Sequence, residues 1–285
     1  MQNELADILD LEMLDINLFR NRHHRENFKG TLFGGQVLAQ ALLACYLTQD
    51  AGNPLLPHSL HAYFLRAGKS DDPVIYDVEK VRDGRSIASR RVVARQYGRS
   101  IFNMASSFHV RESGYSHQSD FPKVPTPEQL IAARQTVNRD NHIPAPDGDT
   151  NADGPLDILA IDNELFECTT PREAEALFWI KSSARLSDDP IHHFCALAFA
   201  SDLGLLATTL LPHGVSIFSE TIYAASIDHA MWFHCTDFRA DEWLLCRTTS
   251  PWAGGGRGFA TGQVFTRDGT LVLTTTQEGL IRPVQ

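Results

Sequence analysis

The sequence has 285 residues, 43% of them hydrophobic, and a formal net charge of −10 at pH 7. This length suits one large domain or two fused domains, and the apolar content is ample for a buried core. The acidic excess argues against nucleic acid or an anionic membrane surface as the main partner, so an anionic ligand would need a local basic cluster.

The first twenty residues are acidic, and their apolar side chains recur near helical spacing, which predicts a short amphipathic helix over residues 5–20. This start lacks the basic and apolar regions of a signal peptide, and the ending RPVQ is no peroxisomal address. No run reaches the roughly 18 uninterrupted apolar residues of a membrane span. The five cysteines are scattered without metal-ligand spacing, so free thiols and a cytoplasmic location are expected.

The first half is expected to hold one apolar helix and about four strands. Gly34-Gly35 opens an Ala/Leu-rich helix that should run from about Gln36 to Leu47. Two glycines there allow another group to approach free backbone N–H groups, although a plain glycine turn is the alternative. The strand-like runs that follow are HSLHAYFLRAG, PVIYDVEKVRDG, RSIASRRVVARQYG and RSIFNMASSFHV. Asp83-Gly84 and Tyr97-Gly98 are predicted hairpin tips.

Residues 115–165 contain six prolines and many Asp residues with little periodicity. This composition predicts a linker with one short helix near residues 128–136. It divides the chain into 1–114, the linker 115–165, and 166–285.

The second half repeats the order of the first. After the strand EALFWIKSSARL comes an apolar run from Phe194 to Leu211, with Asp202 near its middle. An acid among apolar residues is costly unless it is paired or protonated, which makes Asp202 a site candidate. The alternative is that a helix ends near Ala200 and that Ser201 or Asp202 caps the next one. Four more strand-like runs follow, so a duplicated domain is expected.

Several motifs carry a more specific resemblance: FGGQVLAQAL, HSLHAYFLRAG, YDVEKVRDGRS, FASDLGLL, IDHAMWFH and TTTQEGLIR. Together they resemble the acyl-CoA thioesterase II (TesB-like) family over nearly the whole chain, except the linker and the extreme ends. The resemblance implies an α+β double hotdog, in which two long apolar helices are each wrapped by an antiparallel sheet. It also implies hydrolysis of fatty acyl-CoA to free fatty acid and CoA, without a cofactor or a metal, and a homodimer or homotetramer.

The family's catalytic set, as the resemblance implies, maps onto Asp202, Ser226 and Gln277, with Ser226 in a position where the family has Thr. A carboxylate serves as general base for an attacking water, and a hydroxyl and an amide orient that water. The loss of the threonine methyl weakens rotamer control at residue 226. The competing hypotheses are Ser226 as a covalent nucleophile and His58 as the base.

The first half lacks an acid at the corresponding place and is expected to carry approximately Gln40, His58 and Ser107 there. One working site per chain is therefore the hypothesis. Gly34, Gly35 and His58 are candidates for an oxyanion-binding or substrate wall. Candidate contacts for the phosphates of CoA are the arginines on strands and turns, namely Arg82, Arg85, Arg90, Arg91 and Arg257.

Two rival functions remain. A hotdog hydratase or dehydratase would act on acyl thioesters with an Asp/His pair, whereas a hydroxyl and an amide beside an acid suit water positioning. A non-catalytic acyl-CoA-binding module would gain nothing from a buried acid.

Overall fold

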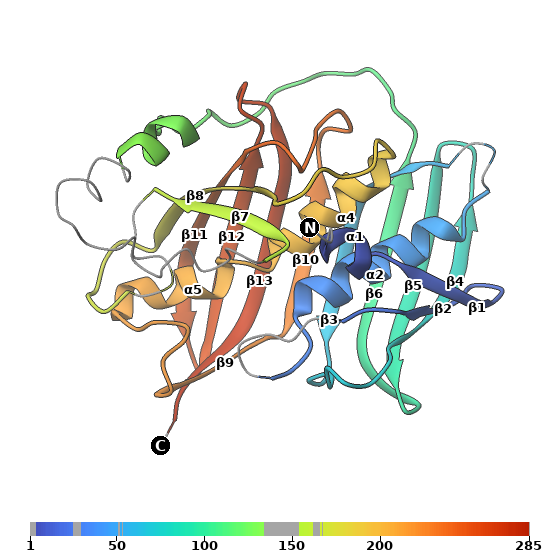
Figure 1. The fold of residues 1–285 in the computed structure, drawn as a ribbon, viewed down its shortest axis with the longest axis horizontal. Helices are drawn as coiled ribbons and strands as arrows, with labels where there is room; N and C mark the ends of the chain where they lie inside the picture. Colours follow the sequence, from blue (N-terminus) through green and yellow to red (C-terminus); the bar gives the residue numbers. More distant parts are fainter. Residues whose placement is uncertain are drawn as a thin grey trace.

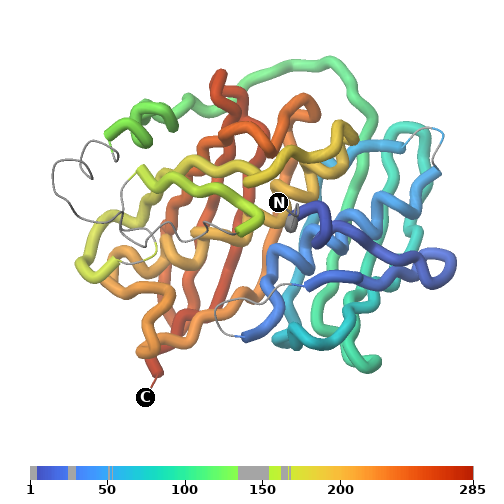
Figure 2. The backbone as a smooth tube through the Cα atoms, viewed as in Figure 1, coloured from blue at the N-terminus to red at the C-terminus, as the bar shows by residue number. Residues whose placement is uncertain are grey.

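The computed structural model describes residues 4–24, 30–50, 52, 54–133, 154–161, 166 and 168–284. Its centre is one antiparallel sheet of thirteen strands, and Figure 1 shows the two principal helices lying together against one face of that sheet. In Figure 2 the blue-to-green first half and the yellow-to-red second half stand side by side.

The first half contains α1 (Glu4–Ile8), β1 (Leu11–Asp15), β2 (Leu18–Asn21), α2 (Gly34–Leu47), β3 (Leu56–Phe64), β4 (Ile75–Asp83), β5 (Ile87–Gln96) and β6 (Arg99–His109). The second half contains β7 (Leu156–Ala160), β8 (Glu175–Ser182), α4 (Pro190–Ser201), α5 (Leu205–Leu210), the 3-10 turn η1 (Leu211–His213), β9 (Ile222–Ser226), β10 (Asp228–Phe233), β11 (Leu244–Gly254), β12 (Arg257–Phe265) and β13 (Leu271–Pro283). Residues 127–133 are also helical, and the rest of the helix expected near 128–136 lies outside the described residues.

The strand order confirms the expected duplication. It runs β1-β2-β4-β5-β6-β3 through the first half and continues β10-β13-β12-β11-β8-β7 through the second, so the second half mirrors the first across the β3–β10 pair. There Ser59 is paired with Trp232 and Tyr63 with Asp228. Strand β9 adds to β13 beside this path. Two such halves, each with a helix against its sheet, form the α+β double hotdog.

The turn predictions hold, but the N-terminal helix is wrong beyond Ile8. Tyr97 and Gly98 both have positive φ angles, as a two-residue hairpin turn between β5 and β6 requires. Residues 11–21 form a hairpin in which Asn17 has a φ of 60°. The hairpin forms because β2 pairs with β4 of the sheet. The helical pattern of residues 11–20 is too short to form a stable helix without such tertiary contacts.

The stretch assigned to the linker also contributes to the sheet. β7 lies within residues 115–165 and pairs with β8, which gives the second half an edge strand in the place that β1 takes in the first. The strand is only five residues long, LDILA, and the prolines and acidic residues around it favour a linker, so it is not predicted from the sequence. The boundary between linker and second half therefore falls before β7.

The two core helices α2 and α4 pack on each other and are buried along almost their whole length. Helices apolar on all sides are stable only when other elements enclose them, as the sheet does here. By length and hydropathy the stretch Pro190–His213 would be sufficient to cross a membrane, but 83% of its most apolar window is buried inside the protein. The run is interrupted, because Gly204 has a φ of 84° and separates α4 from α5.

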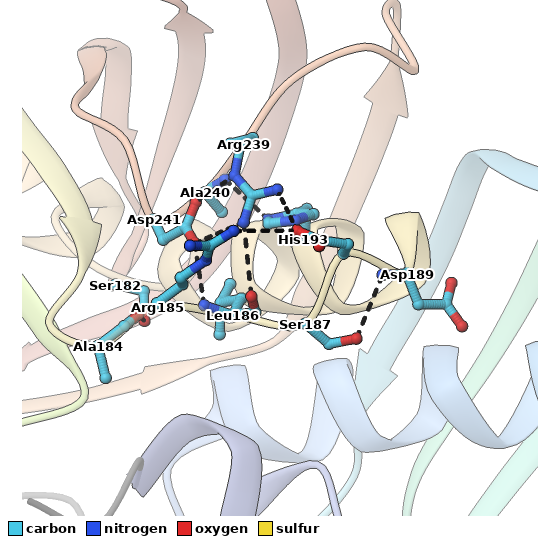
Figure 3. A network of polar contacts seen from close by, with 11 residues as sticks. Ser182, Ala184, Arg185, Leu186, Ser187, Asp189, His193, Arg239, Ala240 and Asp241 are labelled. Carbon is cyan, nitrogen blue, oxygen red and sulfur yellow. Dashed lines mark hydrogen bonds and ion pairs between the residues drawn. The ribbon is translucent and has the colours of Figure 1, made fainter.

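A polar network fixes the N-terminal end of α4 (Figure 3). Arg239 donates to both oxygens of Asp241, at 2.9 and 2.8 Å, and to Asp188 at 2.8 Å. Asp241 also accepts the Leu186 amide at 2.9 Å. Burial raises the pKa of Asp241, but the hydrogen bonds from Arg239 and from the Leu186 amide outweigh that effect and lower the pKa to about 2.

This network predicts an acid-dependent part of the stability. Because the folded pKa of Asp241 lies below its ordinary 3.8, the carboxylate stabilises the fold above about pH 4, and that contribution is lost as the pH falls toward 2. We expect Arg239→Gln to lower the urea midpoint at pH 7 and to flatten the decline between pH 4 and 2. Urea titrations at several pH values test this, with Arg267→Gln, which removes an exposed ion pair with Glu128, as the control. An undiminished acid dependence in Arg239→Gln would contradict it.

Candidate active site

Asp202 lies in the break between the helices α4 and α5. It is the C-terminal cap residue of α4, and Gly204, whose backbone is left-handed, follows two residues later. The helix does end near Ala200, as the alternative interpretation held, but the Asp202 side chain does not cap the next helix, whose cap residue is Gly204. The carboxylate instead turns toward the sheet.

Three elements distant in sequence bring Asp202, Ser226 and Gln277 together. Gln277 Nε2 on β13 lies 2.6 Å from Asp202 Oδ1 and 2.9 Å from Ser226 Oγ. Ser226, the last residue of β9, lies 3.4 Å from the same carboxylate oxygen. Each pair is within hydrogen-bond reach, so the three residues form one connected polar cluster at the edge of an apolar core.

Strand alternation places Gln277 in this cluster. On β13 the odd-numbered residues from 273 to 281 face the helices, and Gln277 is fully buried among them. Its amide nitrogen must face the carboxylate, since the amide oxygen would repel it. Gln277 Oε1 is then a buried acceptor without a hydrogen-bond partner among the described residues. Such an atom is costly in a fold and is characteristic of a site.

The N-terminus of α2 faces the same carboxylate. The Gly35 backbone N–H hydrogen bonds to Asp202, and a Cβ on Gly34 would lie only 2.6 Å from Asp202 Oδ2. A Cβ on Gly35 would lie 2.2 Å from the Phe199 carbonyl oxygen of α4. The glycine pair therefore lets the two helices meet closely, and it directs a helix N-terminus at an anionic side chain.

The surroundings of Asp202 raise its pKa from 3.8 to about 6, although part of the residue stays accessible to solvent. Burial causes the increase, which the hydrogen bonds from Gln277, from the Gly35 amide and from Ser226 oppose. At neutral pH the group is thus mostly ionised while its basicity is well above that of an ordinary aspartate.

The raised pKa predicts that Asp202 destabilises the fold at neutral pH. The folded state binds a proton on Asp202 more tightly than the unfolded state does. The protonated side chain therefore contributes stability below about pH 4, and this contribution is lost as the pH rises through 6. Asp202→Asn is uncharged and should be more stable than the wild type above pH 6, by at most about 3 kcal/mol. Chemical denaturation at pH 4 and pH 8 measures the difference. A variant no more stable than the wild type at pH 8 would contradict it.

His58 is not part of this cluster. Its Nε2 lies 2.8 Å from Ser107 Oγ, and its ring packs edge-on against His109. Burial lowers its pKa, with His109 adding to the effect. His58 is six residues along β3 from Phe64, the residue of that strand that lies beside Gly34. His58 is thus about 20 Å along β3 from Phe64, at the other end of the strand from the part that lies beside Gly34.

The candidate arginines lie in different places. Arg82 and Arg85 are exposed at the β4–β5 turn, and Arg91 faces Glu79 at 3.7 Å. Arg90 is only 1% exposed and donates to Thr48, Asp83 and two backbone carbonyls. The expectation for Arg90 is therefore corrected, because its donors are used inside the protein.

Arg257 is the candidate arginine that lies near the cluster. It starts β12, and its neighbour Gly258 pairs with Gly279, which in turn pairs with Ser226.

The first-half counterpart of Asp202 is Thr48. Both are the C-terminal cap residues of the core helices, α2 and α4. Gln40 lies instead within α2, where its amide donates to the Ile8 carbonyl at 2.6 Å and accepts from Tyr76 at 2.7 Å. The expected position of Gln40 is therefore corrected: α2 runs without interruption through residue 40, and the residue at the helix end is Thr48.

Comparisons with known proteins agree with this architecture. Models of the acyl-CoA thioesterase N-terminal and C-terminal domains match residues 24–109 and 128–281. Acyl-coenzyme A thioesterase 8 of Mus musculus is 36% identical over 98% of this chain and 88% of its own length. Acyl-CoA thioesterase 2 of Haemophilus influenzae is 37% identical over 98% of this chain and 97% of its own.

A solved structure, the acyl-CoA thioesterase II TesB2 of Mycobacterium marinum, superposes with a TM-score of 0.80 at 37% identity and covers 99% of both chains. The structure of a tesB protein of Mycobacterium avium superposes with a TM-score of 0.79 at 29% identity and covers 99% of this chain and 100% of its own. With both domain models matched and relatives of 36–37% identity aligned over 98–99% of this chain, this chain belongs to the acyl-CoA thioesterase II family.

Proposed function

We propose that this acyl-CoA thioesterase hydrolyses fatty acyl-CoA by direct attack of water, with Asp202 as the general base. The observation that carries the proposal is the single amide nitrogen of Gln277, which binds the carboxylate at 2.6 Å and Ser226 at 2.9 Å. Three groups fixed in this way around one point are suited to hold and deprotonate a water molecule.

In the proposed step the water oxygen bonds to the thioester carbonyl carbon while one water proton passes to Asp202. The tetrahedral intermediate then breaks its C–S bond, and the CoA sulfur leaves as a thiolate that takes up the proton held by Asp202, which restores the carboxylate. Ser226 and the buried Gln277 Oε1 orient the water. A base with a pKa near 6 is ionised at pH 7 and still accepts a proton readily, which supports this role.

The surroundings of Ser226 argue against a covalent serine mechanism. The nearest buried histidine in the sequence, His229, bonds to Ser201 and Thr275 rather than to Ser226. Ser226 Oγ accepts a hydrogen bond from Gln277, which reduces its nucleophilicity, and its own hydrogen bond to Asp202, at 3.4 Å, is long for proton transfer to that carboxylate. The same arrangement disfavours the hydratase alternative, because no described histidine bonds to Asp202 to complete an acid–base pair.

Release of free thiol from palmitoyl-CoA tests the proposal. The expected result is steady turnover without an initial burst, since no acyl-enzyme accumulates. Burst kinetics would favour Ser226 as the nucleophile. Binding of acyl-CoA without thiol release would favour the binding module, and hydration of an enoyl-CoA would favour the hydratase.

One site per chain is also expected. Thr48, the counterpart of Asp202, lies 2.7 Å from the buried guanidinium Nε of Arg90, so a carboxylate there would form an ion pair rather than act as a base. We therefore expect Thr48→Asp to retain wild-type turnover and Asp202→Asn/Thr48→Asp to be as inactive as Asp202→Asn. Thiol-release rates of the single and double variants check this. Recovered activity in the double variant would show a second competent site.

Location and assembly are further parts of the proposal. The five cysteines are free thiols, and four are buried, which suits a reducing compartment such as the cytoplasm. The sheet is open at β1 and β7, and open edges favour self-association into a homodimer or homotetramer. Sedimentation of the purified chain distinguishes these states from a monomer.

A further inference from the structure

His229 is a buried histidine on β10 that the proposed chemistry does not use. It is only 1% exposed and lies at the seam between the halves, where its backbone pairs with Ala62 of β3. Its ring nitrogen Nε2 lies 2.9 Å from Ser201 Oγ and 3.1 Å from Thr275 Oγ1. A buried ring with two hydroxyl partners on one nitrogen requires a specific placement of protons.

The hydroxyl protons define the histidine tautomer. Ser201 Oγ lies 2.8 Å from the Ala198 carbonyl, and Thr275 Oγ1 lies 2.9 Å from the Ala230 carbonyl. Each hydroxyl has one proton, and a carbonyl can only accept, so each proton is directed to its carbonyl. With the protons placed in this way, both hydroxyl oxygens accept from His229, and the ring proton is assigned to Nε2. Nδ1 is left as an unprotonated atom without a hydrogen-bond partner among the described residues.

The two acceptors belong to the elements that carry the candidate site. Ser201 is the last residue of α4 and immediately precedes Asp202. Thr275 lies two residues before Gln277 and faces the same side of β13. One shared N–H group therefore joins the end of the helix bearing the acid to the strand bearing the amide.

We propose that His229 is a positioning residue: its Nε2–H holds the Ser201–Asp202 turn against Thr275 and Gln277 and so fixes the 2.6 Å contact between the carboxylate and the amide. This inference rests on the proposed function, because the contact matters for turnover only if Asp202 is the base. Burial lowers the pKa of His229 to about 3, so the ring stays neutral and adds no positive charge beside the carboxylate.

A conservative substitution separates positioning from packing. The amide nitrogen of Gln can occupy the place of Nε2 and donate as the histidine does, whereas Leu fills similar space without a donor. We expect His229→Leu to lower kcat for palmitoyl-CoA about 10- to 100-fold with KM changed less than about threefold, as for other residues that orient a site residue. His229→Gln should recover kcat to within about threefold of the wild type.

His193→Leu is the matched control. His193 is also buried, and its Nδ1 accepts the Ala240 amide near the opposite end of α4. Its loss should lower the Tm while leaving the kcat of the folded enzyme unchanged. If His229→Leu does not fold, the pair Ser201→Ala/Thr275→Val removes the two acceptors instead and should lower kcat about tenfold or more.

Wild-type kcat in folded His229→Leu, or in the acceptor pair, would overturn the positioning role. So would a His229→Gln variant that folds and remains as slow as His229→Leu. Failure of the proposed function looks different: the wild type would release no thiol, or Asp202→Asn would remain fully active. The positioning role is therefore judged only if Asp202→Asn lowers the turnover of the enzyme by at least about 10²-fold.

Discussion

Replacing Asp202 by Asn should lower thiol release from palmitoyl-CoA about 10²- to 10⁴-fold, the usual contribution of a general base. The amide is similar in shape but cannot accept a proton from the attacking water. Its contacts with Gln277 and Ser226 allow the fold to persist, so the loss should lie in kcat and not in the amount of folded protein. Steady-state kinetics together with circular dichroism measure both quantities.

The wild type supplies an independent check on this loss. With a pKa of about 6, Asp202 becomes protonated as the pH falls, so kcat should decline below about pH 6. Gln277→Ala removes a hydrogen bond that lowers this pKa and should move the decline to higher pH. Full activity in Asp202→Asn would return Asp202 to a structural role.

The second large effect is expected at the contact between the two core helices. Gly35→Ala places a Cβ where the Phe199 carbonyl oxygen is 2.2 Å away and the Phe33 ring 2.5 Å away. The carbonyl belongs to a helix backbone and cannot move alone, so α2 and α4 must separate. We expect the free energy of unfolding to fall by about 2–3 kcal/mol, as for other overpacked cores, despite the better helix propensity of Ala. Turnover should fall as well, because the Gly35 amide bonds to Asp202.

Two further glycine variants show whether the effect is local. Gly34→Ala would meet Asp202 Oδ2 and the Phe64 ring, both side-chain atoms, so it should reduce turnover more than stability. At Gly114 a Cβ has no neighbour within 4 Å, so Gly114→Ala should change neither property. Urea denaturation and thiol release compare all three. A stable and active Gly35→Ala variant would show that the helices can separate without cost.

Prediction from sequence succeeded where neighbouring residues decide the outcome. The turn at Tyr97-Gly98 follows from Gly98, which adopts a positive φ without strain, and the strands around it follow from alternation between buried and exposed positions. Asp202 could be identified as a site candidate from sequence because burying an acid within an apolar run is costly unless it is paired or protonated. Prediction failed for residues 11–20, where pairing of β2 with β4 outweighed a weak helical pattern.

The sequence by itself determined the family, the duplicated order of elements, and the residue types of the candidate site. Only the tertiary structure decided which atoms meet: Gln277 reaches Asp202 across 75 residues, the Gly35 amide faces that carboxylate, and Arg90 is enclosed beside Thr48. The physical reason is that local periodicity specifies the face on which a side chain lies. Strand register and helix ends specify its partner, and they depend on packing between segments far apart in the chain.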